Sequence, residues 1–187
     1  MIYLVAATFI ITTTWRSFPG WRAMGFRTAN FARSIWLVLL ASMIAGLEIY
    51  VASKKSTLHA PLSLNAFVHR YWGYVLFACI QQLLLQDFFL PRLVRLMRNP
   101  TRAAFAAAAI FALAHLPNPI LTTATLAWGL AACFFFLRYR NLCPLFLAHS
   151  ILGIALGVCV PGPVIHNMRV GLGYLTYHAP PIDHRNH

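Results

Sequence analysis

Long apolar runs separated by short basic gaps constrain this chain more than any other feature of its sequence. The runs cover residues 2–15, 35–51, 66–93, 101–116, 120–137 and 142–160. A helix that crosses the hydrocarbon core of a bilayer needs about 20 predominantly apolar residues. Because 60% of the residues are hydrophobic and only 10% are charged, the chain lacks the polar side chains that cover a soluble domain. We therefore expect an all-α, polytopic transmembrane bundle of about six helices.

Proline-rich breaks divide the chain. Pro117-Asn118-Pro119 ends the fourth run and Pro161-Gly162-Pro163 ends the sixth, because proline cannot continue a helical hydrogen-bond ladder. The first run lacks the basic start and the small-residue cleavage site of a signal peptide, so we expect a retained helix. The expected organisation is N-terminal transmembrane helices with a basic loop over residues 1–65, a four-helix core over residues 66–160 and a C-terminal polar tail over residues 161–187.

The basic residues lie mainly in alternate gaps and indicate an orientation. The net charge is +12, and ten of the fifteen Lys and Arg residues follow the first, third and fifth runs. These are Arg16, Arg22, Arg27, Arg33, Arg92, Arg95, Arg98, Arg102, Arg138 and Arg140. The positive-inside rule places these gaps in the cytoplasm and both termini on the other side of a cell inner (cytoplasmic) membrane. Since the arginines cluster between apolar runs, they indicate contact with lipid and not with nucleic acid.

Polar side chains inside the apolar runs are the candidate functional residues, because burying them in lipid is costly. They are Gln81, Gln82 and Gln86 in the third run, Phe111 and His115 at the end of the fourth, and His149 within the sixth. Each set also has a structural interpretation: hydrogen bonds between helices for the amides, a helix-end cap for His115 and a hydrogen-bonded core residue for His149. For Glu48 in the second run we expect the side chain to reach the membrane interface. For Trp128 and Phe134-Phe135-Phe136 in the fifth run we expect contact with lipid and with the interface belts.

Taken in order, these residues resemble the motifs of the CPBP family of intramembrane proteases (CAAX proteases and bacteriocin-processing enzymes, or Abi type). That family pattern is E-E-x-x-x-R, then F-x-x-x-H, then H-x-x-x-N or H-x-x-x-D. The resemblance covers about residues 66–160 and implies a CPBP-like four-helix core. It matches Gln81 and Gln82 to the glutamate pair, Gln86 to the arginine, Phe111 and His115 to the second motif, and His149 and Gly153 to the third.

The departures from the family pattern change the chemistry that it implies. In the family the first glutamate activates a water, while the histidines and the asparagine bind the substrate carbonyl. Gln81 and Gln82 cannot deprotonate a water, and general base catalysis is typically worth about 10²–10⁴-fold. Gly153 removes an oxyanion donor, worth about 10²–10³-fold in similar chemistry. Asp87 lies about 140° away from the Gln82 face of an ideal helix, so only a distorted helix would let it replace the base.

Several functions remain open at this stage. The one we favour is a catalytically inactive binding or structural subunit of a larger membrane complex, with lipid, pigment or other membrane proteins as contacts. The alternative is an active CAAX-type endopeptidase in which His115 or His149 is the base and Gln82 positions the water. A transporter or channel is disfavoured because the polar residues are too clustered to line a path. No cofactor is expected, and no metal, since zinc needs about three or four ligands.

Overall fold

The helices of the chain follow the apolar runs closely. The computed structural model describes residues 2–16, 18, 20–28, 30–61 and 63–178. The elements are α1 (Ile2–Arg16), α2 (Phe31–Ser34), α3 (Trp36–Lys54), α4 (Leu64–Leu83), η1 (Leu84–Phe89), α5 (Leu90–Met97), α6 (Pro100–Leu113), α7 (Pro119–Tyr139), α8 (Cys143–Cys159), α9 (Gly162–Ile165), η2 (His166–Met168) and α10 (Leu172–Leu175). No strand occurs within the described ranges, so the expected all-α bundle is confirmed.

Several helices are long and apolar enough to belong in a membrane. By length and hydropathy, three stretches of the described chain qualify as spans: Phe31–Lys54, Leu64–Met97 and Pro119–Tyr139. The helices Pro100–Leu113 and Cys143–Cys159 are apolar but shorter. Because a span needs about 20 apolar residues, these two helices are each shorter than a full crossing. The chain is therefore a membrane protein with several apolar helices.

Asparagine and proline set the start of two helices. Asn99 caps α6, and Asn118 caps α7 by accepting a hydrogen bond from the Leu121 amide at 3.1 Å. In both helices a proline follows the cap, at the position where its missing N–H costs nothing. Asn118 is fully buried and also donates to the carbonyl oxygens of Ile165 and Arg169. The segment after the sixth run is thereby fastened to the α6–α7 turn, whereas residues 179–187 of the expected tail lie outside the described residues.

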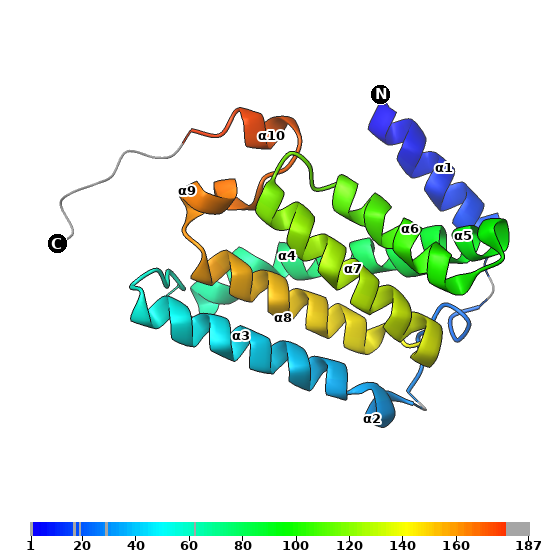
Figure 1. Cartoon of the computed structure of the whole chain (residues 1–187), viewed down its shortest axis with the longest axis horizontal. Coiled ribbons are helices and arrows are strands. Elements are labelled where there is room, and N and C mark those ends of the chain that lie inside the picture. The colour runs from blue at the N-terminus through cyan, green and yellow to red at the C-terminus, as the bar shows by residue number, and fades with distance from the viewer. Residues whose placement is uncertain (1, 17, 19, 29, 62, 179–187) are drawn as a thin grey trace.

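The bundle is built from two closely packed helix pairs (Figure 1). Helix α6 packs against α7, and α3 packs against α8, which also contacts α4. Small residues permit the first contact, because Ala103, Ala104, Ala107 and Ala108 are fully buried on one face of α6. Opposite them, a Cβ added to Gly129 would lie 3.2 Å from the Ala108 Cα. Such small-residue faces let transmembrane helices approach closely.

The aromatic residues of α7 differ from the expectation that they face lipid. Phe136 is fully buried and Phe135 is 4% exposed, while Phe134 is exposed on the outer face. Trp128 is half-buried, with its ring centroid 5.7 Å from that of His149. Lipid and a helix-bundle core are equally apolar, so hydropathy alone cannot distinguish the two faces of α7. The interpretation of Trp128, Phe135 and Phe136 as lipid contacts is therefore wrong.

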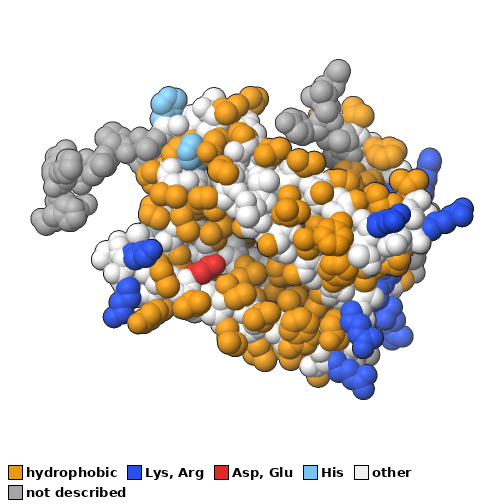
Figure 2. Space-filling view, in the orientation of Figure 1, with side chains coloured by type: hydrophobic (Ala, Val, Ile, Leu, Met, Phe, Trp, Pro, Cys, Tyr) orange, Lys and Arg blue, Asp and Glu red, His pale blue; other side chains and the backbone are white. Residues whose placement is uncertain are grey.

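The Arg-rich connections gather at one end of the bundle. Figure 1 places α2, the α5–α6 turn and the α7–α8 turn at the same end. On the face drawn in Figure 2, Lys and Arg side chains lie at the two ends of the molecule, with a largely hydrophobic band between them. This arrangement is the one that a bilayer-spanning bundle requires. The assignment of the Arg-rich end to the cytoplasm stays a prediction.

Enlarging a small residue in the α6–α7 contact should destabilise the bundle. Ala108→Leu puts three extra heavy atoms against Gly129, and overpacking of this kind typically costs about 1–3 kcal/mol. We expect a lower Tm in detergent micelles for Ala108→Leu than for Ala106→Leu, the same exchange at a half-buried position of the same helix. Equal melting temperatures for the two variants would contradict the close packing of α6 on α7.

Candidate functional site

The amides of the third run lie at a wide helical turn. Residues Leu84–Phe89 form η1, a π-helix between α4 and α5. π-turns are rare and frequently occur at functional sites. Gln81 and Gln82 belong to the last turn of α4, whereas Gln86 lies inside η1. Despite the wider turn, Gln86 Nε2 donates to Gln82 Oε1 at 3.3 Å, and both side chains are fully buried.

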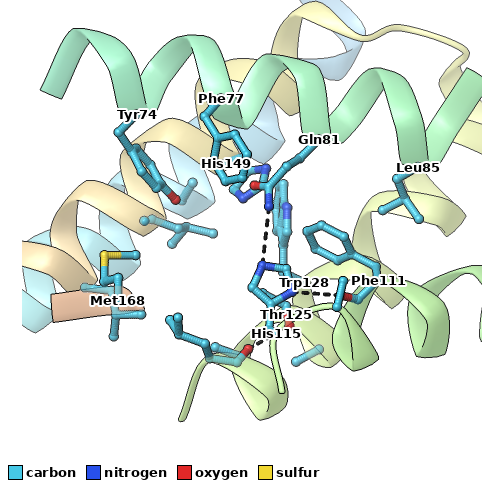
Figure 3. A pocket seen from close by; sticks show the side chains of 18 of the residues that line it. Tyr74, Phe77, Gln81, Leu85, Phe111, His115, Thr125, Trp128, His149 and Met168 are labelled. Carbon is cyan, nitrogen blue, oxygen red and sulfur yellow. Dashed lines mark hydrogen bonds between the residues drawn. The ribbon is translucent and has the colours of Figure 1, made fainter. Parts of the chain in front are cut away.

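Each amide of the Gln81-Gln82 doublet contacts one of the two candidate histidines. Gln81 Nε2 lies 3.3 Å from His115 Nε2, and Gln82 Nε2 lies 3.1 Å from His149 Nδ1. Figure 3 shows the Gln81 side chain extending from α4 toward His115, with the His149 ring close by. Residues far apart in the sequence thus meet in two amide–imidazole pairs. Whether these pairs form a functional site stays a prediction.

The partners of the two rings determine where each imidazole carries its hydrogen. His115 Nδ1 lies 2.7 Å from the carbonyl oxygen of Phe111, which can only accept, so Nδ1 is the donor. The lone pair on His115 Nε2 then accepts from Gln81. His149 Nδ1 accepts from Gln82, which places the hydrogen of this ring on Nε2. Both imidazoles are neutral, and an amide N–H occupies the lone pair of each.

The buried amides and His149 form a chain of hydrogen bonds, called the relay below, in which no side chain carries a formal charge. Gln86 donates to Gln82, and Gln82 donates to His149. Cys133 of α7 lies beside the Gln86 amide, and the buried Gln86 Oε1 has no hydrogen-bond partner among the described residues. Since no member of this relay carries a charge, the position matched to the family arginine needs no cation.

A cavity of about 1040 Å³ lies beside the two pairs. Apolar side chains from α3, α4, α6, α7 and α8 make up most of its wall. The polar side chains that reach the wall include Glu48, Arg70, Tyr74, Gln81, His115 and His149. Gln82 and Gln86 lie behind this wall and reach the cavity only through His149. The cavity therefore has the size and the apolar lining of a site for a hydrophobic molecule.

Tyr74 fills the place that the third motif assigns to an asparagine or aspartate. A Cβ added to Gly153 would lie 1.6 Å from Tyr74 Oη and 2.3 Å from its Cζ. No side chain fits at position 153 while Tyr74 keeps this conformation, so the two residues depend on each other. The sequence contained a signal for this contact, because Tyr74 precedes Gln81 by seven residues and so shares its helix face.

For two further residues of the cavity, Glu48 and Trp128, the sequence predicts a different environment. Glu48 was expected at the membrane interface, but it lines the cavity, and its Oε2 is buried without a partner among the described residues. Trp128 also lines the cavity, and its indole Nε1 is buried and unpaired within the same part of the chain. Both side chains have a large apolar part, which can contact lipid or the cavity equally well. The sequence therefore does not distinguish these two environments.

Asp87 does not enter the site even though the helix is distorted. It lies within η1, close enough to Arg140 for an electrostatic interaction, and its Oδ2 is buried without a hydrogen bond to any described residue. Asp87 is also not among the residues that line the cavity. Over the described ranges, no three His, Cys, Asp or Glu side chains gather as a metal-binding group. The four cysteines are free, and Cys133 and Cys159 are buried among apolar side chains.

Replacing the central amide by a carboxylate should destabilise the protein. In Gln82→Glu the ionised side chain cannot donate to His149 Nδ1 and leaves a charge where the wild-type residue is 0% exposed. Desolvation of an ion at a buried position typically costs several kcal/mol. We expect a lower Tm at pH 8 for Gln82→Glu than for Gln81→Glu, whose side chain faces the cavity. A Gln82→Glu variant as stable as wild type would contradict the direction of the Gln82–His149 bond.

Comparison with known proteins adds a family to this geometry. Residues 63–155 match the model of the family described as type II CAAX prenyl endopeptidase Rce1-like, which is part of the CPBP family. No curated protein and no solved structure matches the chain. The matched segment contains both amide–imidazole pairs, Tyr74 and Gly153. Over residues 63–155, this chain therefore belongs to the Rce1-like, CAAX-protease-type family of membrane proteins.

Proposed function

We propose that this chain is a non-catalytic member of its family, which uses the protease-like cavity to bind a molecule and does not cleave it. One observation carries the proposal: an amide N–H occupies the lone pair of each site histidine. A peptidase must take a proton from water, and neither an amide nor a hydrogen-bonded lone pair is available for that step. The cell inner membrane and an Arg-rich cytoplasmic end are part of the same proposal.

The arrangement of the site disfavours an active peptidase that uses a histidine base. To act as a base, His115 would have to release Gln81, and His149 would have to release Gln82. Gln82 is fully buried and also accepts from Gln86, so its amide is held by hydrogen bonds at both its oxygen and its nitrogen. Gly153 also provides no side-chain donor for an oxyanion.

The absence of proteolysis can be measured on a substrate of the kind that the family name specifies. We expect the purified chain in liposomes to release no tripeptide from a farnesylated CAAX peptide above the level of empty liposomes, as followed by mass spectrometry. His149→Ala should give the same background. Cleavage by wild type that disappears in His149→Ala would overturn the proposal and support the histidine mechanism.

The outer surface supports a second part of the proposal, association with other membrane proteins. Helix α1 exposes Phe9 and Trp15 and touches the bundle through a Phe9–Phe88 ring contact at 6.5 Å. Lipid can cover such a surface, but a partner helix would cover it equally well. We infer that the chain is a subunit of a larger membrane complex and that α1 contributes to its outer contacts.

Extraction in native lipid separates a subunit from an isolated monomer. We expect the chain, taken from its own membrane in polymer-bounded lipid particles, to carry a protein mass well above the 21.0 kDa of one copy. Light scattering of the particles measures this mass, and Phe9→Ser with Trp15→Ser should lower it if α1 forms the contact. A homogeneous particle with one copy and no other protein would contradict the subunit role.

A further inference from the structure

Side chains with hydrogen-bond donors reach the cavity from α4, α7 and α8. We propose that the Tyr74 hydroxyl and the Trp128 indole N–H, together with His149 Nε2, bind the neutral carbonyl oxygen of a long-chain acyl ester that lies in the cavity. The inference rests on the proposed binding function and specifies its ligand. It also assigns roles to Tyr74 and Trp128, two residues outside the family motifs.

The position of Tyr74 Oη follows from its contact with Gly153. The hydroxyl lies 1.6 Å from the point that a Cβ at residue 153 would occupy. Residue 153 is one helical turn beyond His149 on the same face of α8, so the hydroxyl lies on the face of α8 that carries His149. Figure 3 shows the Tyr74 hydroxyl directed into the cavity on the side of His149. The hydroxyl therefore occupies the space in which the family places an amide or carboxyl side chain.

The Trp128 Nε1–H is buried and has no hydrogen-bond partner within the described part of the chain. The Tyr74 side chain lines the cavity, and no hydrogen bond joins its hydroxyl to another described residue. The Trp128 ring lies 5.7 Å from the His149 ring. His149 directs Nε2–H away from Gln82, because Nδ1 is the atom that accepts from the amide. An unpaired buried donor typically costs about 1–3 kcal/mol, so an acceptor that reaches this wall is strongly favoured.

The charges around the cavity select a neutral acceptor. Glu48 lines the same cavity with an unpaired side-chain oxygen, so the wall has an acidic group beside its one arginine and no excess of basic side chains that would favour a carboxylate. Arg70 also lines the cavity, at an exposed position of α4. An ester or amide carbonyl accepts hydrogen bonds without adding negative charge. A lipid ester is favoured over a peptide because the rest of the wall is largely apolar and supplies few partners for a row of backbone amides.

Binding measurements with matched probes test the proposal. Tritiated methyl palmitate and hexadecane share the alkyl chain, but only the ester has a carbonyl oxygen. We expect nanodiscs that contain the protein to bind methyl palmitate at least about fivefold more tightly than hexadecane, relative to empty nanodiscs. Tyr74→Phe keeps the ring in place and removes the hydroxyl. It should weaken methyl palmitate binding about fivefold to tenfold and leave hexadecane binding unchanged.

Controls make the outcomes distinct. Tyr50→Phe removes a hydroxyl from an exposed tyrosine of α3 and should change neither affinity. Equal binding of ester and alkane, or an unchanged ester affinity in Tyr74→Phe, would overturn the donor site. Binding of an apolar decapeptide but not of methyl palmitate would overturn the lipid assignment. If no probe binds, this inference fails, whereas the non-catalytic role depends on the separate cleavage assay.

A paired substitution tests the exchange between positions 74 and 153. Gly153→Asn alone should displace the Tyr74 side chain and lower the Tm, because its Cβ would overlap the Tyr74 hydroxyl. Gly153→Asn combined with Tyr74→Ala should fold and bind methyl palmitate more tightly than Tyr74→Ala alone, since the new amide supplies a donor in the vacated space. A double variant that folds but binds no better than Tyr74→Ala would show that this space has no role in binding the ester.

Discussion

The amide–imidazole hydrogen bonds are the interactions on which the interior of this protein depends. A polar side chain inside a membrane bundle has no water to return to, so its partner must come from another helix. Gln82 meets this requirement by accepting from Gln86 and donating to His149, and it thereby ties η1 to α8. The Gln81–His115 bond connects α4 to the end of α6 in the same way. The same bonds that hold the helices together keep both histidines neutral.

The replacement of glutamate by glutamine changes the direction of these bonds. A carboxylate beside an imidazole accepts a hydrogen and therefore favours an N–H, or a second proton, on the facing ring nitrogen. An amide that directs its N–H toward the ring requires a lone pair there. Glutamate and glutamine thus have the same shape, but the hydrogen lies on the imidazole when it faces a carboxylate and on the amide when it faces glutamine. For this reason the arginine position can hold Gln86, and the chain of hydrogen bonds from Gln86 through Gln82 to His149 contains no charged side chain.

The helices and the meeting of the motif residues followed from the sequence, whereas the cavity wall did not. Runs of apolar residues and Asn-Pro caps fix the helices locally, so their limits were predictable within a few residues. The spacing of Gln82, His115 and His149 predicted a shared site only through the family resemblance. The inward position of Trp128 and the place of Glu48 depend on how α3 and α7 rotate against the bundle. Hydropathy does not predict that rotation, because the lipid and the protein core are both apolar.

The contact between Tyr74 and Gly153 also restricts how this sequence can change over evolutionary time. A mutation that restores asparagine at position 153 meets the tyrosine ring, so it is harmful until position 74 has become smaller. If position 74 becomes smaller first, the cavity has neither the Tyr74 hydroxyl nor an asparagine amide at position 153. Each single step is disfavoured, although the two steps together are tolerated. The overlap therefore couples substitutions at positions 74 and 153, whatever the chemistry of the cavity.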